Sequence, residues 1–241
     1  MKIGFIGVGY MGYGIAKNLI KNKNSLFVIA NKNREPINKI VNDGAKELKN
    51  IKDLCSQNLD ALFLCVTNTP VAKTIAYQII ETLSDKTLII DITTHNKNGS
   101  IEMENILSKK GIKYVECPVM GGPVQALEGV LGGIVGGSEE NFKNSEKYLK
   151  CFCKDYFYFG KIGDGAKSKL LNNFLSLGTA TLTIELIKSA ELFNIDLKKL
   201  YSVAKLGSGN STSLNRIFDA YLKGDSKGYK FSVSNTVKDL T

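Results

Sequence analysis

Short apolar runs alternate with amphipathic stretches along the first two thirds of the chain. The apolar runs are typical of strands, and several carry apolar residues at successive positions, as strands of a sheet covered on both faces do. Between them, apolar positions recur with a helical spacing. This alternation predicts an α/β domain with a mostly parallel sheet. Strands are expected at 2–9, 25–30, 61–66, 87–92, 112–119, 132–137 and 156–160, and helices at 11–21, 36–42, 71–83, 101–110 and 139–150.

The pattern changes near residue 160. One long helical run extends from Gly165 to about Phe193, and shorter helical patterns follow at 196–206, at 214–221 and from Val233 onward. The sequence contains no further strand signal in this region. We therefore expect an α/β domain over residues 1–160 and an all-helical domain over residues 161–241, with the long helix between them.

A glycine motif follows the first predicted strand. In "IGFIGVGYMG", Gly7, Gly9 and Gly12 have the spacing G-x-G-x-x-G, and a helix is predicted to begin within the motif. The first glycine permits a tight turn, the second lets the backbone approach a pyrophosphate, and the third lets helix and strand pack closely. This context predicts a Rossmann-type dinucleotide-binding domain, although glycines in this pattern could serve turn geometry alone. The residues predicted to contact the cofactor here and after the strand at 61–66 are Gly7, Val8, Gly9, Tyr10, Met11, Gly12, Val66 and Thr67.

The end of the second predicted strand indicates which cofactor is bound. NAD-binding domains usually carry an acidic residue there for the ribose hydroxyls. This chain has Asn31, Lys32 and Arg34 instead. An amide and two cations attract a 2′-phosphate, which a carboxylate would repel. The sequence therefore favours NADP over NAD, with the alternative that the two cations are simply exposed.

Charge and composition argue against a nucleic-acid-binding protein, a membrane protein and a metalloprotein. The net charge is +9, but the 32 Lys and Arg residues are scattered along the chain, which indicates a solvated surface rather than a nucleic-acid interface. No apolar run reaches the roughly 18 residues of a membrane span, and the first strand begins at the N-terminus, so we expect a soluble, cytoplasmic protein without a membrane anchor. Five cysteines without paired spacing and a single histidine predict no metal site.

Four further motifs occur in a fixed order along the chain. They are "DITTH" (91–95), "PVMGGPVQALEGVLGGIVGG" (118–137), "GDGAKSKLLNN" (163–173) and "FSVSNTVKDL" (231–240). Together with the glycine motif, they resemble those of the β-hydroxyacid dehydrogenases, the family that includes 3-hydroxyisobutyrate dehydrogenase, tartronate semialdehyde reductase and the glyoxylate and succinic semialdehyde reductases. The resemblance covers nearly the whole chain. It implies a small hydroxy acid, aldehyde or keto acid as substrate, a homo-oligomer, and a helical domain used for substrate binding and dimerisation.

The resemblance also implies roles for individual residues. Aligned on Gly163 and Gly165, the catalytic lysine is Lys169, and its asparagine partner is Asn173. Because Lys167 lies two positions away, it is expected on another face of the helix, in solvent. The predicted substrate-binding residues are Thr94, Met120, Gly121, Gly122, Asn172, Phe231 and Asp239, and Thr94 and Lys238 are also expected near the nicotinamide end of the cofactor.

Two features depart from the family pattern. Met120 replaces a serine that binds the substrate carboxylate, and a thioether cannot donate a hydrogen bond, although the amides of Gly121 and Gly122 can. The family also continues through further helices beyond the position of Thr241, so the helical domain is expected to be short at its C-terminus. His95, next to Thr94, could face the cleft or lie on its rim.

These patterns predict an NADP-dependent oxidoreductase that interconverts a small hydroxy acid and its aldehyde or keto acid, with Lys169 as proton donor and acceptor. An imine reductase is a related alternative, although Lys169 argues against it. An alternative from another class is a non-catalytic NADP-binding sensor or scaffold, which Met120 and the short C-terminus favour and the Lys169–Asn173 pair opposes.

Overall fold

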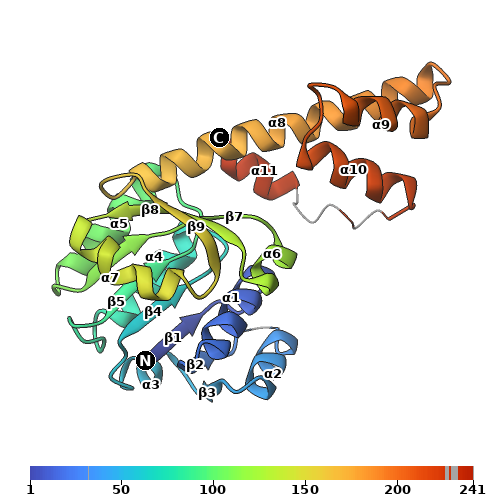
Figure 1. Ribbon diagram of the computed structural model, residues 1–241. Coiled ribbons are helices and arrows are strands. Elements are labelled where there is room, and N and C mark those ends of the chain that lie inside the picture. The colour runs from blue at the N-terminus through green and yellow to red at the C-terminus, as the bar shows by residue number, and fades with distance from the viewer. Residues whose placement is uncertain (32, 226–227, 229–232, 241) are drawn as a thin grey trace. The chain divides into compact units, whose positions relative to one another are not determined.

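The computed structural model describes residues 1–31, 33–225, 228 and 233–240. The chain divides into two compact units, Met1–Lys169 and Leu170–Thr241. Both units can be followed in Figure 1, where the colour runs along the chain from the α/β unit into the helices that follow. The division lies within a long helix, whereas the sequence pattern placed the change of architecture near residue 160.

The first unit contains a sheet in which neighbouring strands are mostly parallel. The strands are β1 (Lys2–Ile6), β2 (Ser25–Ile29), β3 (Lys46–Leu48), β4 (Ala61–Leu64), β5 (Leu88–Asp91), β6 (Lys113–Glu116), β7 (Val119–Met120), β8 (Leu131–Gly137) and β9 (Cys153–Tyr158). Their order is β3-β2-β1-β4-β5-β6-β8-β7, and β9 pairs with β8. The pairs β6–β8 and β7–β8 are antiparallel, and the other pairs are parallel. The predicted α/β class with a Rossmann-type, mostly parallel sheet is confirmed.

Helices cover both faces of this sheet (Figure 1). The helices of the first unit before the long helix are α1 (Tyr10–Lys21), α2 (Glu35–Asn42), α3 (Ile51–Cys55), α4 (Thr69–Ile79), α5 (Lys97–Ser108), α6 (Pro123–Glu128) and α7 (Glu139–Leu149). Side chains from α1, α2, α6 and α7 share one buried cluster with alternate strand residues, such as Phe5 and Phe63. Side chains from α3, α4 and α5 form the other cluster with Leu62 and Leu64. Because successive strand residues point to opposite faces, the strands β1, β2, β4, β5 and β6 contribute to both clusters.

The second unit is helical where it is described. Helix α8 (Asp164–Leu192) enters it, and α9 (Leu197–Leu206), α10 (Thr212–Leu222) and α11 (Val233–Leu240) follow. A small core contains Ala180, Ile187 and Leu214, and Tyr201 stacks on Phe218 with ring centroids 4.8 Å apart. Within the described ranges no strand follows β9, so the predicted all-helical region is confirmed there.

Helix α8 is long and apolar enough to cross a membrane by length and composition alone. Core helices of soluble proteins have the same property, so this is weak evidence for a membrane span. Several of its large apolar side chains are exposed in the described chain, among them Leu171, Phe174, Leu175 and Leu182, each about 70% exposed.

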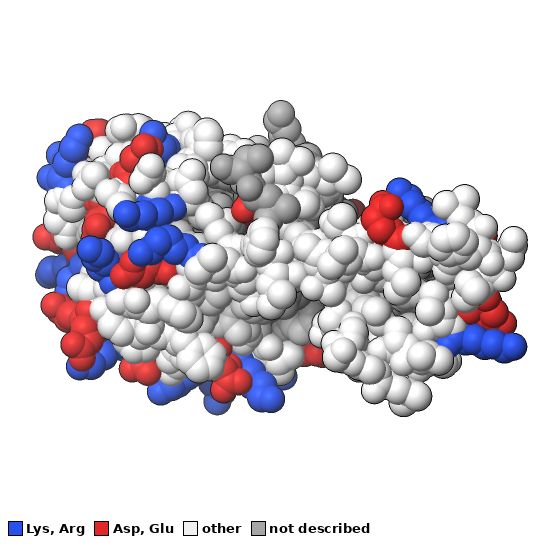
Figure 2. All heavy atoms as spheres, turned by 90° about the horizontal axis from the view of Figure 1, so that it is seen from above, with Lys and Arg blue, Asp and Glu red and all other residues white. Residues whose placement is uncertain are grey.

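Charged residues of both signs share the surface. Figure 2 shows Lys and Arg next to Asp and Glu on the surface in view. Ion pairs such as Lys73–Glu102 (2.6 Å) and Lys143–Glu139 (2.6 Å) join charges of opposite sign in the first unit. On the face shown, carboxylates therefore lie between the basic side chains, which do not form one continuous basic patch.

Candidate active site

The glycine motif adopts the geometry that a pyrophosphate requires. Gly7 has a positive φ of 105°, and a Cβ at this position would overlap the carbonyl of Cys65. A Cβ at Gly12 would overlap the carbonyl oxygen of Gly7, so this glycine lets α1 pack against the loop. A Cβ at Gly9 would meet no described atom within 4 Å, which leaves open space at the N-terminus of α1. These residues fit a dinucleotide phosphate next to the amides of a helix N-terminus.

The other residues of the predicted cofactor loop lie around this turn. Val8 is buried, Tyr10 is 82% exposed, and Met11 is half-buried. Tyr10 and Met11 are the first residues of α1, with Gly9 as its N-cap. The loop therefore presents backbone amides and two side chains at one end of the sheet.

The predicted 2′-phosphate site is only partly described. Asn31 is exposed after β2, and Lys32 lies outside the described residues. The guanidinium of Arg34 forms a two-pronged pair with Glu47, with Nη1 to Oε1 at 2.6 Å and Nη2 to Oε2 at 3.0 Å. This exposed pair raises the pKa of Arg34 through its hydrogen bonds with Glu47. Sequence reasoning missed Glu47, which places a carboxylate among the residues expected to attract a phosphate.

The carboxyl ends of β4 and β5 carry the next group of predicted residues. The amide of Val66 donates to Oγ1 of Thr93 (3.2 Å), so the two strand ends are linked. Thr67 is exposed and Thr94 is half-buried. In a parallel sheet this edge is where ligands bind, so Val66, Thr67 and Thr94 lie where a nicotinamide cofactor is expected.

His95 is a buried structural residue and does not lie on a rim. Its side chain is fully buried, with Nε2 2.9 Å from Oδ2 of Asp91 and Nδ1 2.9 Å from Oγ1 of Thr69. Asp91 also accepts from the amide of Thr93 (2.9 Å) and from the hydroxyl of Tyr114 (3.3 Å). The network ties the turn that carries Thr94 to the start of α4, so the role of His95 is to hold this turn.

Lys169 lies in the second turn of α8 and is 9% exposed. Its ammonium donates to the carbonyl oxygen of Val119 (2.9 Å) and approaches the sulfur of Met120 (3.4 Å). Lys167 is exposed and pairs with Asp164 at 2.6 Å. The structure therefore confirms that Lys167 lies in solvent, and it places Lys169 against the segment that contains Met120.

Glu116 anchors the helix that carries Lys169. This carboxyl is 1% exposed, and its Oε1 accepts from the amides of Gly163 (2.7 Å) and Ala166 (3.1 Å) at the start of α8. A Cβ at Gly136 would overlap Oε1, and one at Gly165 would come within 3.0 Å of it. Burial raises the pKa of Glu116, while the helix amides oppose this rise. Sequence reasoning missed this residue, although Gly165, one of the two glycines used to align the lysine, makes room for it.

The turn after Met120 differs from the expected anion site. Gly121 has a positive φ of 114°, as a tight turn requires. The amide of Gly122 donates to Oε1 of Gln125 at 2.9 Å. In this structure Gln125 therefore accepts the N–H of Gly122, and the expectation that a substrate carboxylate rests on the Gly121 and Gly122 amides stays a prediction. Nothing in the local sequence pattern indicated this contact.

In the second unit, Asn173 donates from Nδ2 to Oδ2 of Asp239 at 2.7 Å, and both residues are buried. The structure thus brings together two residues that are 66 positions apart and were both predicted for the site. The proposed role of Asn173 as the partner of Lys169 stays a prediction. Lys238 lies in α11, but its side chain and the whole of Phe231 lie outside the described residues.

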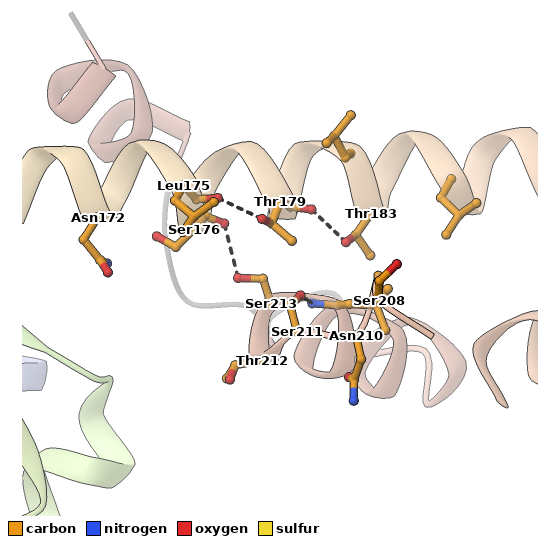
Figure 3. Close-up of a pocket in the computed structure, with 14 residues that line it drawn as sticks. Asn172, Leu175, Ser176, Thr179, Thr183, Ser208, Asn210, Ser211, Thr212 and Ser213 are labelled. Carbon is orange, nitrogen blue, oxygen red and sulfur yellow. Dashed lines mark hydrogen bonds between the residues drawn. The ribbon is translucent and has the colours of Figure 1, made fainter. Parts of the chain in front are cut away.

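Asn172 lines a groove in the second unit (Figure 3). The groove has a volume of about 570 Å³ and lies between α8 and the segment that joins α9 to α10. Its lining contains hydroxyl and amide groups beside leucines, and no charged side chain: Asn172, Leu175, Ser176, Thr179, Leu182, Thr183, Leu186, Ser208, Gly209, Asn210, Ser211, Thr212, Ser213 and Leu214. The hydroxyl of Ser213 donates to the carbonyl of Ser176 (3.2 Å), which fixes one wall to the other. Sequence reasoning did not anticipate this groove.

The fold and the glycine loop define a dinucleotide-binding oxidoreductase, and comparisons with known proteins agree. Residues 2–160 match the NAD-binding domain of 6-phosphogluconate dehydrogenase, and residues 163–241 match the NAD-binding domain described for NADP-dependent 3-hydroxyisobutyrate dehydrogenase. The chain belongs to the β-hydroxyacid dehydrogenase family.

Individual relatives support the same assignment. The chain is 30% identical over 223 residues to a probable mitochondrial 3-hydroxyisobutyrate dehydrogenase of Dictyostelium discoideum, covering 91% of this chain and 67% of that protein. It is 25% identical to the 2-(hydroxymethyl)glutarate dehydrogenase of Eubacterium barkeri, covering 100% and 80%. The fold matches a solved 3-hydroxyisobutyrate dehydrogenase from Salmonella typhimurium with a TM-score of 0.91 at 22% identity, covering 99% and 84%. The chain thus spans 67% to 84% of the length of these proteins.

Proposed function

We propose that this chain transfers a hydride between NADP(H) and a small hydroxy acid, whose oxidised partner is a semialdehyde or keto acid. The observation that carries the proposal is the buried Lys169, held by the carbonyl of Val119 and by Met120 on the unit that contains the glycine loop. The nicotinamide supplies the hydride when it is bound. The protein must then orient the substrate and move a proton.

Lys169 suits the proton transfer. Reduction of a carbonyl places negative charge on its oxygen, and a cationic donor within hydrogen-bond reach stabilises that charge and delivers the proton. Glu116 and the glycines around it fix the start of α8, so the position of Lys169 is set by a buried anchor rather than by a flexible loop. In the oxidation direction, the same amine can accept the proton once it is neutral.

The alternative is a binding module without catalysis. A protein of that kind needs the glycine loop but has no use for a buried lysine beside the Met120 turn. Oxidation of NADPH with a panel of small aldehydes, semialdehydes and keto acids separates the two. The proposal expects turnover with at least one carbonyl compound, and tight NADPH binding without any turnover would support the sensor or scaffold instead.

We also propose that NADP(H) is preferred over NAD(H), and the first prediction concerns this preference. Asn31 and Arg34 stand where a carboxylate would favour NAD, but the Arg34 side chain is paired with Glu47. Replacing Glu47 with glutamine should tighten NADPH binding about two- to fivefold, because the exposed pair competes for the guanidinium. Fluorescence titrations with NADPH and NADH measure both dissociation constants.

NADH serves as the internal control, since it has no 2′-phosphate. Its dissociation constant should exceed that of NADPH in the wild type and should stay unchanged in Glu47→Gln. Equal or tighter NADH binding by the wild-type chain would contradict the proposed preference. An equal gain for both cofactors would show that Glu47 does not act through the phosphate.

A second prediction concerns assembly. We propose that the chain forms a homo-oligomer, with a second copy covering the exposed apolar side chains of α8. Leu171, Phe174, Leu175 and Leu182 form an unusually apolar set for a solvent-exposed helix. Light scattering after size-exclusion chromatography should give more than one chain per particle for the wild type and a smaller particle for Leu175→Glu/Leu182→Glu. A monomeric wild type would contradict the proposal.

A further inference from the structure

The segment beside Lys169 has few groups that can bind an anion. Its sequence from 119 to 126 is "VMGGPVQA", and Gln125 is its only residue with a hydrogen-bonding N–H or O–H in the side chain. Two groups contact the Lys169 ammonium from this segment, the carbonyl of Val119 and the sulfur of Met120, and both are acceptors. A carboxylate placed here would need donors that neither group supplies.

Gln125 lies against the turn that contains Gly121. A Cβ built on Gly121 would lie 3.2 Å from Cβ of Gln125 and 3.6 Å from its Cγ. The amide oxygen of Gln125 is fixed by the N–H of Gly122 at 2.9 Å. Because the oxygen is used in this way, the NH₂ group of the same side chain is the part left to donate to a ligand. The half-buried side chain is therefore held in one orientation next to the exposed Gly121.

The helix that carries Gln125 is packed tightly against the cofactor loop's own helix. Nδ2 of Asn18 on α1 lies 2.8 Å from the carbonyl oxygen of Ala126 and 3.1 Å from that of Leu127. Gly14 permits this approach, since a Cβ there would lie 2.6 Å from the backbone of Ala126. Gln125 therefore lies on a helix, α6, that is fixed relative to α1, and α1 begins at the glycine motif. A donor on such a support can recognise a substrate with little loss of side-chain freedom.

We propose that Gln125 binds the carboxylate of the substrate through its side-chain NH₂ group. It takes the role that the family resemblance assigned to residue 120 and that Met120 cannot perform. The inference rests on the proposed function and adds the side chain that selects acids from other carbonyl compounds. Gly122 contributes indirectly, because its N–H orients the glutamine amide.

Gln125→Glu is the most discriminating variant. A glutamate oxygen still accepts from the Gly122 N–H, and glutamate is favoured in the first turn of a helix, so α6 and its cap are retained. The NH₂ donor is replaced by a carboxylate that repels an acid substrate. With succinic semialdehyde, KM should rise about 10- to 100-fold, the effect expected for losing a hydrogen bond to a charged group. With butanal, which has the same chain length and no carboxylate, kcat/KM should change by less than about threefold.

Two further variants complete the test. Gln78→Glu, at an exposed position of α4, introduces the same charge away from the site and should leave both substrates unchanged. Met120→Ser in the Gln125→Glu background supplies a new hydroxyl and should recover part of the affinity for succinic semialdehyde. NADPH affinity and the melting temperature should match those of the wild type in Gln125→Glu.

The outcomes separate this inference from the proposed function. A wild type that reduces both aldehydes, with Gln125→Glu unchanged or equally impaired on both, would overturn the inference alone. A wild type that oxidises NADPH with no carbonyl compound would overturn the proposed function. In that case calorimetric titration of succinate into the NADP⁺-saturated protein still decides the inference: binding should weaken about tenfold or more in Gln125→Glu, and equal binding would overturn it.

Discussion

Lys169→Ala is expected to lower kcat by about 10²- to 10⁴-fold, the range typical of losing a general acid. The Lys169 ammonium lies beside the carbonyl of Val119. When alanine replaces the lysine, residue 169 no longer provides a cationic proton donor. Cofactor affinity should barely change, because the glycine loop is untouched. Steady-state kinetics with the best substrate of the carbonyl panel and a parallel NADPH titration measure the two effects.

Lys167→Ala is the matched control for this prediction. Lys167 is on the same helix, two residues earlier, but it is exposed and pairs with Asp164. Surface pairs of this kind contribute about 0 to 1 kcal/mol, so the variant should keep near-normal turnover and stability. Equal losses in the two alanine variants, or near-full turnover in Lys169→Ala, would mean that a different group transfers the proton.

The glycine loop gives the second large effect, and its members should behave differently. Gly7→Ala should lower the free energy of unfolding by about 2 to 4 kcal/mol. The alanine would have to adopt a positive φ, and its methyl group would clash with a backbone carbonyl. Its φ is 105°, and its Cβ would overlap the carbonyl of Cys65. Gly9→Ala should leave stability unchanged, since its Cβ meets no described atom within 4 Å.

The same pair should separate folding from cofactor binding. In Gly9→Ala the new methyl group occupies the space through which a pyrophosphate approaches the backbone, so NADPH affinity should fall about tenfold or more. Chemical denaturation and NADPH titration of both variants test this division. Normal NADPH binding by Gly9→Ala would contradict the assignment of this loop to the cofactor phosphates.

The sequence predicted those parts of the fold that leave a local pattern. The glycine motif was readable because its spacing is local: Gly12 packs against Gly7, five positions earlier, although Gly7 also lies against the carbonyl of Cys65. The strands that are buried on both faces were also found, since their apolar runs are unbroken. The elements that were missed are short: β3 and β7 have three and two residues, and α3 and α6 have five and six. Such segments are too short to show a period.

Parts of the site that depend on distant contacts were not predicted. Glu116 meets the start of α8 across 47 residues of sequence, and Asn173 meets Asp239 across 66. The spacing of apolar residues along the chain does not indicate a contact between residues this far apart in sequence. Lys169 was nevertheless located, because Gly163 and Gly165 recur in the family motif. The structure gives each glycine a physical reason: Gly163 has a positive φ of 91°, and Gly165 makes room for the buried carboxyl of Glu116.

Met120 and Gln125 show where a motif can mislead. The motif located the turn beside Lys169, and the loss of a hydroxyl at Met120 was visible in the sequence. The use of the Gly122 amide by Gln125 became visible only in the structure, because it depends on the rotamer of one side chain. Substrate recognition is therefore the part of the function for which the sequence was least sufficient.

In the proposed reaction, hydride passes between NADPH and the carbonyl carbon of a small acid. The most direct measurement is isotope transfer from NADPH carrying deuterium at the reactive position of the nicotinamide, with succinic semialdehyde as acceptor and mass spectrometry of the product. We expect a hydroxy acid with deuterium on the carbon that bears the new hydroxyl, formed by the wild type and by Lys167→Ala and strongly reduced in Lys169→Ala. A product without deuterium, or no product while NADPH binds normally, would contradict it.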